Sequence, residues 1–149
     1  MTRIVAYGTV RRASALCQLT LTDGVLLVRI TVIALVVELA IRVLTLPTVA
    51  RLARVSLGNP AVALDRAAPR FSRGEIRAVR AARRVMRHWP WGGGTCLRRS
   101  LLMGYLLRRH NPTLRLGVKR HDAGILAHAW LDIPGVVGPG VGDYHAFDL

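Results

Sequence analysis

Long apolar runs fill much of the first half of the chain. The segment from Gly24 to Pro47 reads GVLLVRITVIALVVELAIRVLTLP, and its charged residues are Arg29, Glu38 and Arg42. Glu38 and Arg42 are four residues apart, a spacing that suits an ion pair on the surface of a helix. We therefore predict one or two helices between Gly24 and Leu57, with Pro47 at a boundary or kink.

The same segment is about as long as a membrane-spanning helix. A charge at the centre of a bilayer costs about 2.5–3.5 kcal/mol, however, and this segment contains three. We therefore favour a soluble helix that is buried or faces a partner, and keep a membrane-associated helix as the alternative. Residues 1–23 have no continuous apolar stretch near the start of the kind found in signal peptides, so we expect a cytoplasmic protein.

A basic amphipathic helix is predicted from Ser72 to about His88. Ser72 is followed by Glu75 three residues later, which is the sequence pattern of a capping box. Apolar residues recur on one side at helical spacing, and the other side carries Arg73, Arg77, Arg80, Arg83, Arg84 and Arg87. This basic face is either simply solvated or binds an acidic partner.

Three glycines, Gly92–Gly94, come before a further amphipathic helix that runs from Cys96 to about His110. After Pro112 the spacing of apolar residues shifts toward two, which is typical of strands. The predicted strands are Thr113–Arg120, Gly124–Ile133 and Gly142–Leu149.

Helices first and strands last predict an α+β fold, with a helical N-terminal half packed on a small antiparallel sheet. A chain of 149 residues has the length of one domain. Within this domain, residues 1–90 form the helical, arginine-rich part, and residues 91–149 carry the candidate chemistry. Hydrophobic residues make up 52% of the chain, which excludes a disordered protein.

The net charge of +14 comes almost entirely from arginine, since Lys119 is the only lysine. A charge of this size predicts attraction to nucleic acid, to an anionic membrane surface, or to an acidic protein or peptide. Aromatic residues make up only 5% of the chain, and no zinc-finger or RNA-recognition motif occurs. We therefore expect no nucleic-acid partner. A basic nucleic-acid-binding or membrane-associated scaffold without catalysis is the alternative function.

The stretch WPWGGGTCLRRS places Cys96 behind a glycine run and a threonine. Thr95 is a suitable N-cap, which puts Cys96 in the first turn of a helix, where free N–H groups and the helix dipole favour a thiolate. The glycines let a substrate approach the backbone closely. Cysteine hydrolases use a nucleophile in this arrangement. Cys17 is interpreted as a small buried hydrophobe. Paired metal-ligand spacings do not occur, so we expect neither a metal nor a cofactor.

A cysteine nucleophile needs a base, and the chain offers His88, His110, His121, His128 and His145. His128 is preferred because it lies in the apolar run LAHAWL, where an imidazole is costly without a partner. Trp130 is two residues further on and should share its strand face. The alternative is a histidine of the core with only a structural role.

A carboxylate should orient this imidazole. Asp132 lies about 13 Å along the same strand, which is too far for a hydrogen bond. If the chain turns directly after Ile133, a two-residue hairpin pairs His128 with Val141 and places Asp143 diagonally opposite on the same face. Asp148 has the opposite parity in that register and is the reserve candidate.

The run GGGTCLRRSLLMGYLLRRH, followed by LRLGVKR and LAHAWLDIPG, resembles the transglutaminase-like cysteine protease family that acts in lasso-peptide biosynthesis. The similarity is to the leader-peptidase half of the family's B protein, here as a stand-alone chain. The family motif is a Cys-Leu-x-Arg-Ser helix start, then His-Ala-Trp at the end of a strand, then an aspartate after a short turn. Cys96, His128 and Asp143 fall on these positions. The connection IPGVVGPGVG is longer than the usual turn of the family.

This resemblance implies a papain-like triad on a transglutaminase-like fold. The Cys96 thiolate would attack one peptide bond of a ribosomally made lasso-peptide precursor and so release its leader. His128 would protonate the leaving amine and then activate water, while Asp143 would fix the imidazole tautomer.

The resemblance also implies partners: the leader of the lasso precursor peptide, a separate leader-recognition protein, and a lasso cyclase related to asparagine synthetase. The family's usual cleavage signal is a threonine next but one to the cut. From charge alone, we expect the basic helix that begins at Ser72 to bind the recognition protein or an acidic leader. Membrane association is possible for this protein but is not the favoured interpretation.

Overall fold

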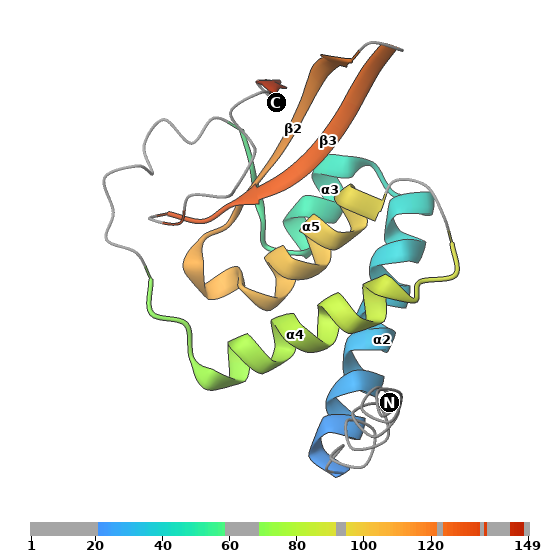
Figure 1. The fold of residues 1–149 in the computed structure, drawn as a ribbon, viewed down its shortest axis with the longest axis vertical. Coiled ribbons are helices and arrows are strands. Elements are labelled where there is room, and N and C mark those ends of the chain that lie inside the picture. The colour runs from blue at the N-terminus through green and yellow to red at the C-terminus, as the bar shows by residue number, and fades with distance from the viewer. Residues whose placement is uncertain are drawn as a thin grey trace, which may run out of the picture.

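A computed structural model describes residues 21–58, 69–91, 95–121, 124–134, 136 and 144–147. The helices are α2 (Leu21–Val43), α3 (Leu46–Leu52), α4 (Arg73–Arg87), α5 (Thr95–Leu106) and the short 3-10 helix η1 (Arg108–His110). The strands are β1 (Ser56–Leu57), β2 (Thr113–His121), β3 (Gly124–Asp132) and β4 (His145–Ala146). The predicted α+β fold is confirmed, with the helices gathered on one side of a sheet whose β2–β3 hairpin projects from the body (Figure 1).

The helices predicted from the apolar pattern are present. The long apolar run forms α2 and α3, and Pro47 lies in the first turn of α3, where its missing N–H costs no helical hydrogen bond. The capping box of α4 is confirmed: the Ser72 Oγ accepts from the Glu75 N–H at 3.2 Å, and the Ser72 N–H donates to the Glu75 carboxylate at 2.8 Å. The Ser72 N–H lowers the pKa of Glu75, with a smaller contribution from His110.

β2 is the central strand of the sheet. It forms an antiparallel hairpin with β3 from Thr113↔Asp132 to His121↔Gly124. Its other edge pairs with β1 near the start of β2 and with β4 further along, at Gly117↔Ala146. Since β1 runs parallel to β2, the sheet is mixed rather than purely antiparallel. The residues Ser56–Leu57, predicted to end the helical region, form this extra strand.

The predicted turn directly after Ile133 is present: Ile133 and Val136 form an antiparallel bridge, and the Val136 N–H donates to the Ile133 carbonyl oxygen at 2.9 Å. His128 lies opposite Gly117 of β2 on one edge of β3, and its predicted partner Val141 lies outside the described residues. The hairpin does not continue as far as β4, because His145 and Ala146 pair with β2 rather than with β3. The physical reason is that β2 offers two edges: nine residue pairs with β3 occupy one. β1 covers only the start of the other, which leaves room there for β4. Asp143 and Asp148 lie outside the described residues.

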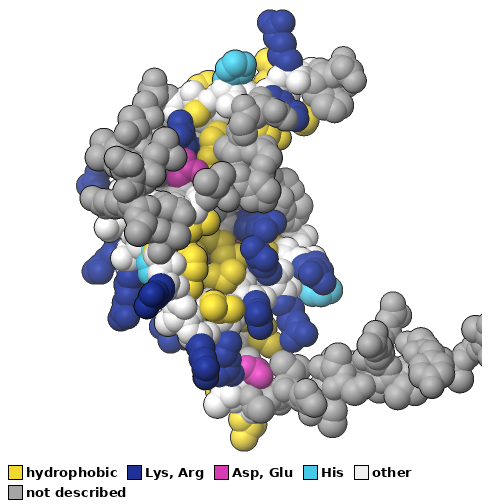
Figure 2. Space-filling view, turned by 60° about the vertical axis from the view of Figure 1, so that its left-hand side comes forward, with side chains coloured by type: hydrophobic (Ala, Val, Ile, Leu, Met, Phe, Trp, Pro, Cys, Tyr) yellow, Lys and Arg dark blue, Asp and Glu magenta, His cyan; other side chains and the backbone are white. Residues whose placement is uncertain are grey.

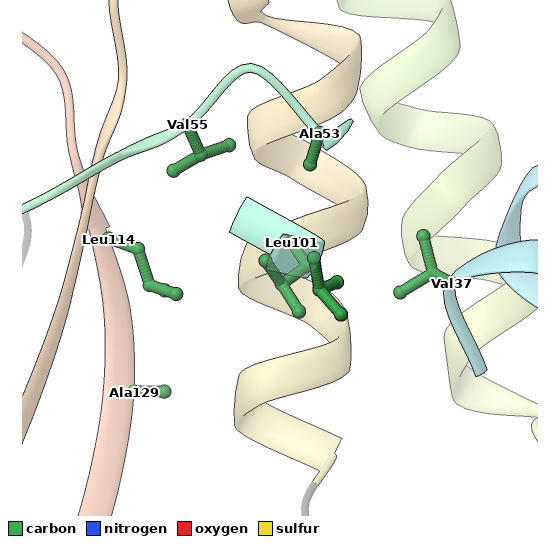
Figure 3. Close-up of a cluster of buried hydrophobic side chains, with 7 residues drawn as sticks. Val37, Ala53, Val55, Leu101, Leu114 and Ala129 are labelled. Atoms are coloured by element: carbon green, nitrogen blue, oxygen red, sulfur yellow. The ribbon is translucent and has the colours of Figure 1, made fainter. Parts of the chain in front are cut away.

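α5 is the central helix of the core. Its fully buried Leu101 packs with Val37, Val49, Ala53, Val55, Leu114 and Ala129, which come from α2, the α3–β1 region and the sheet (Figure 3). The next residue, Leu102, is also fully buried and packs with Ile30, Ala34, Ala81 and Ala82 of α2 and α4. α5 is therefore fixed between the sheet on one side and two helices on the other.

Candidate active site

Cys96 is the second residue of α5, so the prediction that it lies in the first turn of a helix is confirmed, although Thr95, expected as the N-cap, is the first residue of the helix itself. Its side chain is half-buried, carries a free thiol and packs against the hydrophobic cluster around Leu101. The first N–H groups of a helix have no partner within the helix, and the helix dipole adds positive potential there. The start of α5 can therefore stabilise a negative charge on an oxygen atom bound there.

Ser100 joins this helix to β3. It lies one turn beyond Cys96 on the same side of α5, about 6 Å along the axis. Its buried hydroxyl donates to the carbonyl oxygen of Ala129 at 3.1 Å. Because Ala129 directly follows His128, this bond fixes the helix of the candidate nucleophile against the strand of the candidate base. Ser100 is part of the motif that carries the sequence resemblance, but only the structure reveals this contact.

The His128 side chain is half-buried in a group of aromatic rings. Its ring centroid lies 6.2 Å from that of Trp130, nearly parallel to it, and 5.2 Å from that of Tyr144. The prediction that His128 and Trp130 share a strand face is therefore confirmed. Ala129 points to the opposite face, toward Leu101 of α5. The imidazole thus lies on the face of β3 away from the hydrophobic cluster.

Gly117 provides the space for this aromatic group. A Cβ at Gly117 would lie 2.8 Å from Trp130 Cη2 and 2.8 Å from the carbonyl oxygen of His145. Two cations border the same rings: the Arg115 guanidinium lies 5.8 Å from the Trp130 ring centroid, and the Lys119 ammonium 5.3 Å from that of Tyr144. The surroundings of His128 are therefore aromatic and cationic.

The other described aspartate and histidines considered as candidates lie in contacts that do not involve Cys96 or His128. Asp132 pairs with Arg115 at 3.4 Å, and His110 Nε2 lies 3.0 Å from the Glu75 carboxylate. His88 caps α4, and His145 is an exposed residue of β4. Within the described part of the chain, no three His, Cys, Asp or Glu side chains come together as a metal site.

A buried ion pair fixes the start of α5. The Glu38 carboxylate of α2 is only 5% exposed and pairs with Arg98, two residues after Cys96. The Arg98 Nη2 also donates to Glu38 Oε1 at 3.2 Å, and the Arg42 Nε donates to the same oxygen at 2.8 Å. The predicted Glu38–Arg42 pair is thus present, but its carboxylate is buried and shared with a second helix.

The same two arginines hold Trp91, the last described residue before the glycine run. The Arg98 Nη1 donates to the Trp91 carbonyl oxygen at 3.3 Å. The Arg42 guanidinium lies 5.7 Å from the Trp91 ring centroid. Through Arg98 and Arg42, Glu38 therefore fixes Trp91, which precedes the glycine run, and α5, which follows it. The sequence could not reveal this because Glu38 and Arg98 are 60 residues apart.

We predict that Glu38→Gln lowers the free energy of unfolding by about 3 kcal/mol or more, because Arg98 loses its charged partner in a buried site. The double variant Glu38→Gln/Arg98→Met should regain part of this loss. Arg42→Met is the matched control: it removes the exposed partner of the same carboxylate and should cost about 1 kcal/mol or less. Urea unfolding of the four proteins measures these differences. An equal decrease in the free energy of unfolding in Glu38→Gln and Arg42→Met would contradict the role assigned to the buried pair.

Comparison with known proteins identifies the family. The sequence profile of the transglutaminase-like superfamily matches residues 33–148, from the middle of α2 to beyond β4. No curated protein and no solved structure matches the chain. The superfamily has a fold of the cysteine-protease type, in keeping with a cysteine at the start of a central helix that packs on a sheet. The matched region covers most of the chain, and the protein belongs to the transglutaminase-like superfamily.

Proposed function

We propose that this protein is a cysteine peptidase that removes the leader from a lasso-peptide precursor. Cys96 is the nucleophile, His128 the general base and acid, and Asp143 the residue that orients the imidazole, with Asp148 as the reserve. One observation carries the proposal: Cys96 is half-buried in the first turn of α5, and Ser100 on the same face bonds to β3 beside His128.

The chemistry follows from this placement. The Cys96 sulfur attacks the scissile carbonyl carbon, and backbone N–H groups at the start of α5 stabilise the oxyanion. His128 gives a proton to the leaving amine, which departs as the carbonyl collapses to a thioester. Water, deprotonated by His128, then cleaves the thioester and restores the thiol. These steps require no metal and no cofactor.

The proposal sets a requirement for His128. In the structure its ring packs on Trp130 and Tyr144, so the imidazole must turn toward Cys96 when the precursor binds. Hydrogen bonds of catalytic groups are often formed fully only in the substrate complex. Because the pleat sets the direction of a strand side chain, this movement requires a local rearrangement of β3, which in the described sheet pairs on one edge only, with β2.

The proposed partners are the lasso precursor, a leader-recognition protein and a cyclase related to asparagine synthetase, all in the cytoplasm. The basic face of α4 supports an acidic docking partner, because its arginines are exposed. Figure 2 shows a surface on which Lys and Arg side chains are many and acidic ones few. Only Arg77 among the α4 arginines forms an ion pair in the described structure, with Asp23.

Cys96→Ala should abolish leader release, because no other atom of the site can form the thioester. The protein, the precursor and the recognition protein are incubated together, and intact masses report the free leader. Cys17→Ala is the matched control and should release the leader at the wild-type rate. His128→Ala should lower the rate by a factor of about 1,000 or more.

The third residue is tested by comparing Asp143→Ala with Asp148→Ala in the same assay, and only the first should reduce the rate strongly. Leader release by folded Cys96→Ala would contradict the proposal. Absence of leader release by the folded wild-type protein would also contradict it, and would favour the alternative of a basic scaffold without catalysis.

For the docking face, Arg80→Glu/Arg84→Glu should weaken binding of the recognition protein or leader about tenfold or more, since like charges then face each other. Arg51→Glu/Arg109→Glu changes the net charge equally at exposed positions outside α4 and should bind as the wild type does. Titration calorimetry measures both. Equal affinity for the two double variants would exclude α4 as the docking site.

A further inference from the structure

α2 carries an apolar surface that the rest of the described fold does not cover. Eight aliphatic side chains recur at helical spacing along its whole length and are between 43% and 92% exposed: Leu21, Val25, Val28, Val32, Leu35, Val36, Leu39 and Val43. At 100° per residue they fall on one side of the helix, in a stripe about 33 Å long. Such a continuous exposed patch in a folded domain marks an interaction surface.

The opposite side of α2 is fixed in the domain. Ile30 and Ala34 are buried against α4 and α5, and Val37 packs in the cluster with Leu101. Glu38 is tied to Arg98 of α5. By length and hydropathy alone α2 could cross a bilayer. Its packed side argues against this, because a spanning helix would have to leave these contacts. α2 therefore lies along the domain and presents its stripe outward.

The borders of the stripe are basic. Arg29 lies about 70° from the centre of the stripe on one side of the helix, and Arg42 about 70° on the other. Both are exposed: the Arg29 side chain can extend away from an apolar layer to its polar boundary, and the Arg42 guanidinium stays partly open to solvent while its Nε is bonded to Glu38. The acidic residues of α2 are engaged elsewhere: Asp23 pairs with Arg77, and Glu38 is buried.

We propose that α2 binds flat on the surface of an anionic lipid bilayer, with the stripe in the outer hydrocarbon region and Arg29 and Arg42 among the headgroups. A helix with an apolar face bordered by arginines has the composition that binds such interfaces. A second copy of the chain fits the surface less well, because pairing two stripes would bring four border arginines together in chains of net charge +14. The proposal is independent of the peptidase activity.

Flotation with vesicles tests it, using the full chain and vesicles of either phosphatidylcholine alone or phosphatidylcholine with phosphatidylglycerol. The wild type should float with the anionic vesicles and about tenfold less with neutral ones. Val32→Asn/Leu39→Asn leaves the net charge unchanged and should reduce binding to anionic vesicles at least tenfold. Arg29→Gln should weaken binding about fivefold, whereas Arg83→Gln, an equal charge change on α4, should have less effect. Thermal unfolding confirms that each variant is folded.

Three outcomes would overturn the proposal. One is no flotation of the folded wild type, including the case in which it sediments as a dimer. Another is equal binding of the wild type and Val32→Asn/Leu39→Asn, which would show that general positive charge is responsible. The third is resistance of the bound protein to extraction with alkaline carbonate, since a surface-bound helix is released and a spanning helix is retained.

Discussion

The buried carboxylate of Glu38 connects the parts of this molecule that matter most for its chemistry. It joins α2 to the first turn of α5 through Arg98 and, through Arg98 and Arg42, holds the residue before the glycine run. Removing charges from water is costly, and a buried ion pair seldom adds much net stability. Its value lies in geometry: each partner left alone would be a buried charge, so the start of α5 has one favourable position.

Two helices near Glu38 differ in how far they are packed: α5 is held between the sheet and two helices, whereas one side of α2 is exposed. α5 is locked by Leu101 and Leu102 into two hydrophobic clusters, and Ser100 adds a directed bond to β3. A nucleophile on such a helix is placed by the core rather than by a loop, which limits the reorganisation needed during reaction. The outward side of α2 has the opposite character, since it is apolar and uncovered by the described residues. α2 thus supports the candidate site with its packed side and presents an exposed apolar surface on its other side.

The sequence predicted those features whose signals are local. Ser72 and Glu75 define a helix start within four residues, and the position of Cys96 follows from the threonine and glycines before it. Strand pairing was less accessible, because the partner of β4 depends on which edge of β2 remains open after β1 and β3 have paired. The choice of Asp143 over Asp148 used a hairpin whose turn after Ile133 is present, whereas its predicted pair His128–Val141 reaches outside the described residues. The other support for Asp143 is the resemblance of the sequence to the lasso-peptide protease motif. Glu38 illustrates the same limit: its neighbour Arg42 was predictable, but its burial and its pairing with Arg98 were not.

The central claim is that His128 activates the sulfur of Cys96, although its ring packs on Trp130 and Tyr144 in the structure. The most direct measurement is the rate at which iodoacetamide alkylates Cys96 at neutral pH in a Cys17→Ala background, followed by intact mass with precursor present. The account predicts that His128→Ala slows alkylation at least tenfold, while His145→Ala leaves the rate unchanged. Equal rates in the parent and in folded His128→Ala would contradict it.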